Sequence, residues 1–215
     1  MIIVAGPPGS GKSSRFPIAA FGLDWFNADN RAADLNFGSF RGISPAIRLR
    51  VNLEFQRWIL DHISAHKSFA IETTLRSSIT FEQSRLAHSK GFWTSMDYVA
   101  VGSVEESIHR IMERSYRGGH SASERLVKDI YENSTRNLLT ALDFAESGID
   151  VVGIYDNSEV GVSVKHVLNF IQGRLHAIAN EIPDWVESLF RGTKFDIARL
   201  RATPVGEETN EPGNQ

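Results

Sequence analysis

The sequence predicts an α/β fold in which a mostly parallel sheet is flanked by helices and followed by a small C-terminal appendage. Short apolar runs alternate with stretches of helical periodicity, which is the pattern of parallel strands joined by crossover helices. The chain of 215 residues is 41% hydrophobic and 23% charged, a composition ordinary for one globular domain. Collagen-like, coiled-coil and fully disordered chains are therefore excluded.

Four apolar runs are the expected strands, over 1–5, 69–75, 96–102 and 151–155. The first run meets Gly6, and a helix is expected to begin near Gly11. A core-facing helix is expected over 44–66, because Ser44 is a capping residue and Pro45 suits a first turn. Apolar residues follow at helical spacing.

Two later helices each begin with a capping box, in which a serine is followed three residues later by a glutamate. The boxes are Ser103 with Glu106, before a helix over 104–117, and Ser121 with Glu124, before a helix over 122–147 that Gly148 closes. Only a tight joint separates the two predicted helices.

The pattern changes after Asp156, which sets the predicted division of the chain. Residues 1–158 are expected to form the core, with a lid near 104–121, and residues 159–202 an appendage packed on it. Two strand-like runs and one amphipathic helix are expected in the appendage, over 162–171, 175–178 and 183–190. Residues 203–215 have almost nothing to bury and should form a disordered tail.

Composition also excludes several classes of function. No run reaches the roughly 18 uncharged apolar residues of a membrane helix, and the start lacks the basic region of a signal peptide, so a cytoplasmic location is expected. The absence of cysteine removes disulfides and thiolate catalysis, and the seven histidines show no metal-ligand spacing. The net charge of −3 gives no general attraction to nucleic acid or membranes.

The strongest motif is a complete G-x-x-x-x-G-K-S loop between the first strand and a helix. With the serine that follows, its residues are Gly6, Pro7, Pro8, Gly9, Ser10, Gly11, Lys12, Ser13 and Ser14. Glycine-rich turns let backbone N–H groups converge on phosphate oxygens, and the helix N-terminus adds partial positive charge. Lys12 is expected to reach the terminal phosphates and Ser13 to offer an oxygen to Mg²⁺. The motif predicts nucleotide binding.

A second feature is Asp29, in the segment 27–31, which lies where the second strand of a phosphate-loop domain would end, at the same crevice as the first strand. A carboxylate there could accept a proton from an acceptor hydroxyl that attacks the terminal phosphate. The alternative is that Asp29 caps the next helix, since Asn and Asp are common capping residues. The residues alone leave both interpretations open.

A third feature is the polar end of the strand expected over 69–75. Ligands of open parallel sheets bind beyond the carboxyl ends of the strands, so Glu72, Thr73 and Thr74 are candidate substrate contacts. Glu72 could hold hydroxyls of an acceptor or a metal-bound water. The alternative is an ordinary strand-end ion pair between Glu72 and Arg76.

A fourth feature is a set of arginines on one helical face, Arg110, Arg114 and Arg117, followed by Gly118 and Gly119 as a candidate hinge. Arginines on a mobile lid can neutralise the charge that phosphoryl transfer spreads over the transferring oxygens. At least one of the three is therefore expected to face the phosphates. The alternative is a solvated face paired with glutamates of the same helix.

Six segments within 1–158 occur in a specific order: GPPGSGKS, the NADN segment with Asp29, SFAIETTLR, SIHRIMERSYRGGH, the helix with Asn137-Leu138, and the turn Asp156-Asn157-Ser158. Together they resemble the zeta-toxin family of P-loop kinases. The resemblance implies a P-loop NTPase/kinase-like fold and an ATP-dependent kinase. In characterised toxin members, such a kinase phosphorylates the 3′-hydroxyl of UDP-N-acetylglucosamine, and the family implies an antitoxin as protein partner.

The resemblance also implies roles for individual residues. Lys12 and Ser13 match the phosphate and magnesium positions, Asp29 matches the catalytic base, Glu72 matches the acidic substrate contact, and Arg114 and Arg117 lie in the segment of the phosphate-facing arginines. Four positions depart from the family pattern: Ala122-Ser123 replace valine-proline, Ile130 replaces an arginine, and Thr73 replaces the glycine of the toxin kinases. The nucleotide site is unaffected by these departures, whereas the identity of the acceptor is left open.

Three functions are compatible with these observations. The leading one is a kinase that uses ATP and Mg²⁺ to phosphorylate a hydroxyl of a small molecule, such as a nucleotide sugar. The second is a polynucleotide 5′-hydroxyl kinase, against which the near-neutral charge and the lack of a basic-aromatic stripe argue. The third is a regulatory nucleotide-binding module without chemistry, supported by Ile130 and the altered lid.

Overall fold

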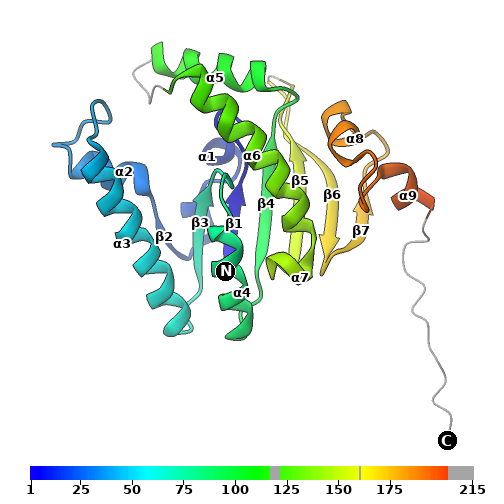
Figure 1. Ribbon diagram of the computed structural model, residues 1–215, viewed down its shortest axis with the longest axis horizontal. Coiled ribbons are helices and arrows are strands. Elements are labelled where there is room, and N and C mark those ends of the chain that lie inside the picture. Colours follow the sequence, from blue (N-terminus) through cyan, green and yellow to red (C-terminus); the bar gives the residue numbers. More distant parts are fainter. Residues whose placement is uncertain (117–121, 160, 203–215) are drawn as a thin grey trace, which may run out of the picture.

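The computed structural model describes residues 1–116, 122–159 and 161–202. Within these ranges, seven strands form one sheet in the order β2-β3-β1-β4-β5-β6-β7 (Figure 1). The strands are β1 (Ile2–Ala5), β2 (Asp24–Phe26), β3 (Phe69–Thr73), β4 (Ser95–Ala100), β5 (Val151–Asp156), β6 (Lys165–Ile171) and β7 (Arg174–Ile178). Strands β1 to β5 are parallel, and β6 and β7 join as antiparallel neighbours. The predicted fold class is confirmed.

Helices cover the two faces of the sheet unequally. The helical elements are α1 (Lys12–Arg15), the 3-10 turn η1 (Ile18–Phe21), α2 (Ala28–Asp34), α3 (Pro45–Ser64), α4 (Ile79–Ser89), α5 (Val104–Tyr116), α6 (Glu124–Leu142), α7 (Phe144–Ser147), α8 (Asp184–Phe190) and α9 (Ile197–Ala202). The long helices α3, α4 and α6 lie across one face (Figure 1). No helix in the described ranges is long and apolar enough to span a membrane.

The main hydrophobic core lies between the sheet and the long helices. It includes Ile59 and Ile63 of α3 and Leu138 of α6, all of them almost completely buried. The opposite face carries a small second cluster built on Val4, Ile18 and Ala70, under α1 and η1. Because β1 to β5 are parallel, their carboxyl ends meet at one edge of the sheet, which is where ligands of such sheets bind.

The helices differ from expectation in two places. The helix that begins near Gly11 is only four residues long, because Pro17 has no N–H and disfavours a helical conformation at Phe16, which adopts φ −131°. The helix expected over 122–147 is capped by Ser123, whose hydroxyl accepts from Leu126 N, and Ser121 lies outside the described residues. It also breaks at Asp143, whose carboxylate caps α7.

Residues 165–178 extend the same sheet through two further strands. The expected strands of this region are present as β6 and β7, and the expected helix as α8. The aromatic rings of Phe170 in β6 and Phe195 meet edge to face at 5.6 Å between centroids, which ties the C-terminal segment to the sheet. The predicted tail over 203–215 lies outside the described residues.

Candidate active site

The G-x-x-x-x-G-K-S loop connects β1 to α1 at the carboxyl edge of the sheet. Gly6 has φ +138°, and a Cβ atom there would lie 1.9 Å from Val99 O, so only glycine fits. Gly9 has φ +72° and a Cβ would lie 2.8 Å from Ser107 O in α5. The glycines therefore permit both the sharp turn and the close approach of α5.

Two residues outside the motif hold the loop in place. Asn157 is buried after β5, its Nδ2 donates to Ser10 O at 2.8 Å, and its Oδ1 accepts from Arg15 Nε at 3.2 Å. Ser107 Oγ in α5 donates to Pro8 O at 2.5 Å. Sequence reasoning noticed Asn157 only as part of a turn and missed Ser107, since no spacing rule relates either residue to the loop.

Lys12 folds back onto the loop and is the electrostatic centre of the site. Its Nζ donates to Gly6 O and Pro7 O, each at 2.8 Å, and the residue is buried. The pKa of Lys12 is lowered to about 8, mainly by burial; the negative charges of Glu72 and Asp29 oppose this shift and the positive charge of Arg114 adds to it. Three of the other predicted residues thus lie close enough to Lys12 for their charges to act on it.

Ser13 and Glu72 form a pair of oxygen donors beside Lys12. Strands β1 and β3 are neighbours in register, with Val4 opposite Glu72. Ser13 Oγ donates to the Glu72 carboxylate, at 2.9 Å to Oε2 and 3.1 Å to Oε1. Within the described ranges Glu72 makes no ion pair with Arg76, so the strand-end ion pair is not formed.

Asp29 lies in the first turn of α2 and is exposed. The cap of this helix is Asn27, whose Oδ1 accepts from Asn30 N at 2.9 Å. The alternative interpretation of Asp29 as the helix cap is therefore wrong. Asp29 is one of the residues that line the cleft described next.

A cleft of about 650 Å³ opens beside these residues, a volume typical of small-molecule sites. Its lining includes Asp29, Glu72, Thr73 and Thr74, together with Arg48, Asn52, Gln56, Arg76, Gln83 and Ile130. The turn after β3, which contributes Thr74 and Arg76 to the lining, contains Leu75 with φ +55°. Leu75 N donates to Thr73 Oγ1 at 3.1 Å, and Leu75 O accepts from Asn137 Nδ2 at 2.8 Å.

The arginines of α5 have different surroundings. Arg110 is half-buried and donates to Glu106 Oε1 and to the carbonyls of Asn157 and Ser158, so its guanidinium holds the turn after β5. Arg114 is exposed, and its charge acts on Lys12. Arg117 and the predicted hinge at Gly118 and Gly119 lie outside the described residues.

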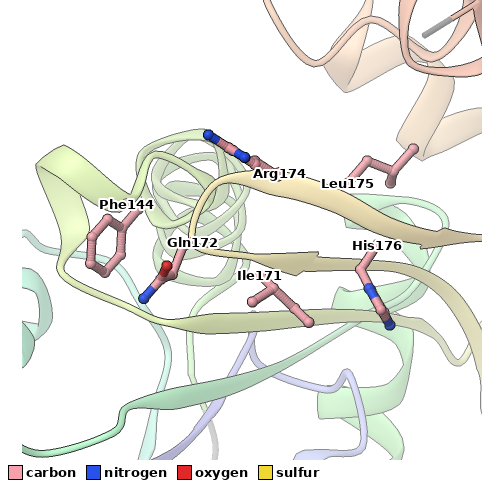
Figure 2. A pocket seen from close by; sticks show the side chains of 6 residues that line it. All are labelled: Phe144, Ile171, Gln172, Arg174, Leu175 and His176. Carbon is pink, nitrogen blue, oxygen red and sulfur yellow. The ribbon is translucent and has the colours of Figure 1, made fainter. Parts of the chain in front are cut away.

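A second hollow, of about 690 Å³, lies at the β6–β7 hairpin (Figure 2). Its lining residues are Phe144, Ile171, Gln172, Arg174, Leu175 and His176. Ile171 pairs with Val151 at the start of β5, so the hollow lies near the amino end of that strand. The phosphate loop lies at the carboxyl ends of the strands, on the opposite side of the sheet. The lining of the hollow offers no carboxylate or hydroxyl. The carboxylates and hydroxyls described above lie instead at the carboxyl ends of the parallel strands.

Fold and loop together define a P-loop kinase-like α/β protein, with a candidate nucleotide site and an adjacent cleft. No family model matches the chain. An uncharacterized protein of Haemophilus influenzae is 32% identical over 69 residues, which make up 32% of this chain and 49% of that protein.

Solved structures show the likeness in fold more fully. A chain of the AvrRxo1-ORF1:-ORF2 complex with ATP is 16% identical with a TM-score of 0.64, over 83% of this chain and 60% of that chain. The same complex with sulphate ions gives a TM-score of 0.66 at 15% identity, over 87% of this chain and 62% of that chain. The PezAT chromosomal toxin–antitoxin system of Streptococcus pneumoniae gives 0.54 at 16% identity, over 73% of this chain and 66% of that chain.

These likenesses confirm, at the level of the fold, the resemblance to the zeta-toxin kinases. The chain spans about three fifths of the matched chain of the AvrRxo1-ORF1:-ORF2 complex, and the matched stretch is about half of the Haemophilus protein.

Proposed function

We propose that this protein is an ATP-dependent kinase that transfers the γ-phosphoryl group of ATP to a hydroxyl of a small molecule. The observation that carries the proposal is the convergence of Lys12, Ser13, Glu72 and Asp29 between a complete phosphate loop and a cleft of about 650 Å³. The AvrRxo1-ORF1 complex that contains ATP has the same fold and supports ATP as the donor.

The residues present fit a nucleotide with Mg²⁺. Ser10 Oγ is buried and has no hydrogen-bond partner within the described ranges, as expected of a group whose partner is a ligand oxygen. Ser13 Oγ and the Glu72 carboxylate are hard oxygen donors suited to Mg²⁺ or a water bound to it. Among the described residues no three His, Cys, Asp or Glu side chains form a metal cage. Mg²⁺ would supply charge neutralisation to the phosphates.

Asp29 is the proposed general base. Its carboxylate takes the proton of the acceptor hydroxyl, whose oxygen forms a bond to the γ-phosphorus while the bond from that phosphorus to the bridging oxygen of ADP breaks. In the free protein the Lys12 ammonium donates to two backbone carbonyls. We expect it to bind the terminal phosphate instead when ATP is present, because phosphate oxygens carry more negative charge than carbonyl oxygens. Arg114 adds a second cation from α5 as the site closes.

The cleft favours an acceptor that carries negative charge besides its hydroxyl. Arg48 and Arg76 both line it, and neither makes an ion pair within the described part of the chain. The diphosphate of a nucleotide sugar such as UDP-N-acetylglucosamine would meet that requirement. Ile130 provides an apolar wall where the zeta-toxin family has an arginine, so we expect the acceptor contacts to differ there.

We also propose a protein partner of the antitoxin type. The two solved systems named above are assemblies of two proteins, AvrRxo1-ORF1 with AvrRxo1-ORF2, and the PezAT toxin–antitoxin system. Their shared fold with this chain supports the expectation.

A screen of acceptors tests the proposed function. The full chain is incubated with ATP and Mg²⁺ and with nucleotide sugars, nucleosides, sugars and 5′-hydroxyl oligonucleotides, and products are identified by mass spectrometry. We expect a phosphorylated anionic small molecule. Phosphorylation of oligonucleotides alone would favour a polynucleotide kinase, and saturable ATP binding without any product would favour a regulatory module.

ATP affinity is expected to fall as the pH rises above about 8. The pKa of Lys12 is lowered to about 8 in the free protein, and bound phosphates favour the charged form, so binding takes up a proton above that pH. Calorimetry at pH 9 in buffers of different ionisation enthalpy measures the uptake. Lys12→Arg should abolish it, because arginine stays charged. Equal heats in all buffers for the wild type would contradict the assignment.

Arg114 and Arg110 are expected to respond differently to replacement by lysine. Arg114→Lys removes the planar fork near Lys12 and should lower turnover at least about tenfold with little change in stability. Arg110→Lys weakens the turn after β5 and should mainly lower the free energy of unfolding, by about 1–2 kcal/mol. Steady-state kinetics and thermal unfolding separate the two. Normal turnover in Arg114→Lys would make Arg114 a solvated surface residue.

A further inference from the structure

The outward face of α3 carries leucines at coiled-coil spacing. Ala46, Leu49, Leu53 and Leu60 recur at intervals of three, four and seven residues, which is the a and d pattern of a seam between helices. Leu49, Leu53 and Leu60 are 62%, 59% and 45% exposed. We call these four residues the α3 seam. In Figure 1, α3 lies at one rim of the molecule.

The fold itself does not use this seam. Helix α3 packs on the core through another face, on which Val51, Ile59 and Ile63 are buried. Along the seam runs a hollow of about 400 Å³, lined by Ala46, Leu49, Arg50, Leu53, Glu54 and Arg57. Solvent-facing positions of a surface helix are normally polar. An apolar stripe beside a hollow is instead typical of a groove that receives a helix.

The charges beside the seam select its occupant. The charged residues that line the hollow are Arg50, Arg57 and a single acid, Glu54, and the next acid along α3 is Asp61 beside Leu60. Glu54 is already shared by Arg31 Nε at 2.8 Å and Arg50 Nε at 2.9 Å. Within the described ranges Arg57 makes no ion pair. Arg31, Arg50 and Arg57 therefore outnumber Glu54 around the hollow, which is bordered by net positive charge.

A second copy of the chain is a poor occupant for this reason. Parallel pairing of two α3 seams would bring Arg50 against Arg50, and antiparallel pairing centred on Leu53 would bring Arg50 near Arg57. Like charges placed together across an interface disfavour it.

We propose that the α3 seam docks an amphipathic helix of a second protein, with acidic residues flanking its apolar face. Apolar side chains of that helix fill the hollow, and its carboxylates pair with Arg50 and Arg57. The neighbouring face of α3 carries Arg48 and Asn52, which line the candidate acceptor cleft, so the partner lies next to that cleft. The docking does not depend on phosphoryl transfer and can fail or succeed independently of it.

A display library of helical peptides tests this proposal on the full chain. All peptides carry the same stripe of apolar residues along one helical face. In half of them this stripe is flanked by Glu, and in the other half by Lys. We expect the selected binders to be acidic and to lose at least about tenfold in affinity for Leu53→Glu. They should keep their affinity for the matched control Leu126→Glu, whose leucine on α6 is 44% exposed. Arg57→Glu should shift the preference toward basic peptides.

Both leucine variants should keep the wild-type melting temperature, because the replaced side chains are exposed, and thermal unfolding checks this. Three results would overturn the proposal: no binder that depends on Leu53, binders without an acidic bias, or dimers of the wild type in sedimentation that Leu53→Glu abolishes. The last would make a second copy the occupant.

Discussion

Replacing Lys12 with alanine is expected to lower phosphoryl transfer by about a hundred- to a thousandfold while leaving the fold intact. The ammonium is the cation expected at the terminal phosphate, and its removal leaves transition-state charge without its closest partner. Stability should change by only about 1 kcal/mol, because two hydrogen bonds to Gly6 O and Pro7 O are lost while a desolvated charge is also removed.

Turnover with the true acceptor and thermal unfolding are the two measurements for this variant. Ser13→Ala is the companion, because it should weaken Mg²⁺-dependent nucleotide binding and leave Lys12 in place. Activity like that of the wild type in Lys12→Ala, with the variant folded, would exclude the kinase assignment.

Asp29→Asn is expected to lower turnover by roughly a hundredfold or more with nearly unchanged ATP affinity. The amide keeps the size of the side chain and cannot accept the proton of the acceptor hydroxyl. Steady-state kinetics and nucleotide titration measure the two effects. A parallel loss of ATP affinity would place Asp29 in the metal environment instead.

Asn27→Ala is the matched control, because Asn27 caps the same helix two residues earlier. Its loss should cost about 1 kcal/mol of stability with little effect on turnover of the folded enzyme. If Asp29→Asn and Asn27→Ala changed stability and turnover in the same proportions, Asp29 would have only a structural role in α2.

Much of the fold was predictable because its signals are local. The phosphate loop follows from eight consecutive residues, and the parallel sheet from apolar runs separated by helical periodicity. The cap of α2 was ambiguous, because Asn27 and Asp29 are both good capping residues and only backbone geometry chooses between them. The early end of α1 was also readable in principle, from Pro17.

The supports of the site were not predictable, because they join segments far apart in the chain. Asn157 reaches Ser10 across 147 residues, and Ser107 reaches Pro8 across 99. Arg110 shares a helical face with Arg114, yet it binds the carbonyls of the turn after β5. Helical spacing can group such residues on one face but contains no information on what that face meets.

Transfer of an isotopic label from the γ-phosphoryl group of ATP to the best acceptor tests the central claim most directly. Products of the wild type and of Asp29→Asn are compared by mass spectrometry after equal times. The account predicts a labelled phosphoester of the acceptor with the wild type, and about one hundredth of that yield or less with Asp29→Asn. Label released only as inorganic phosphate, or ATP left unconsumed with every acceptor, would contradict it.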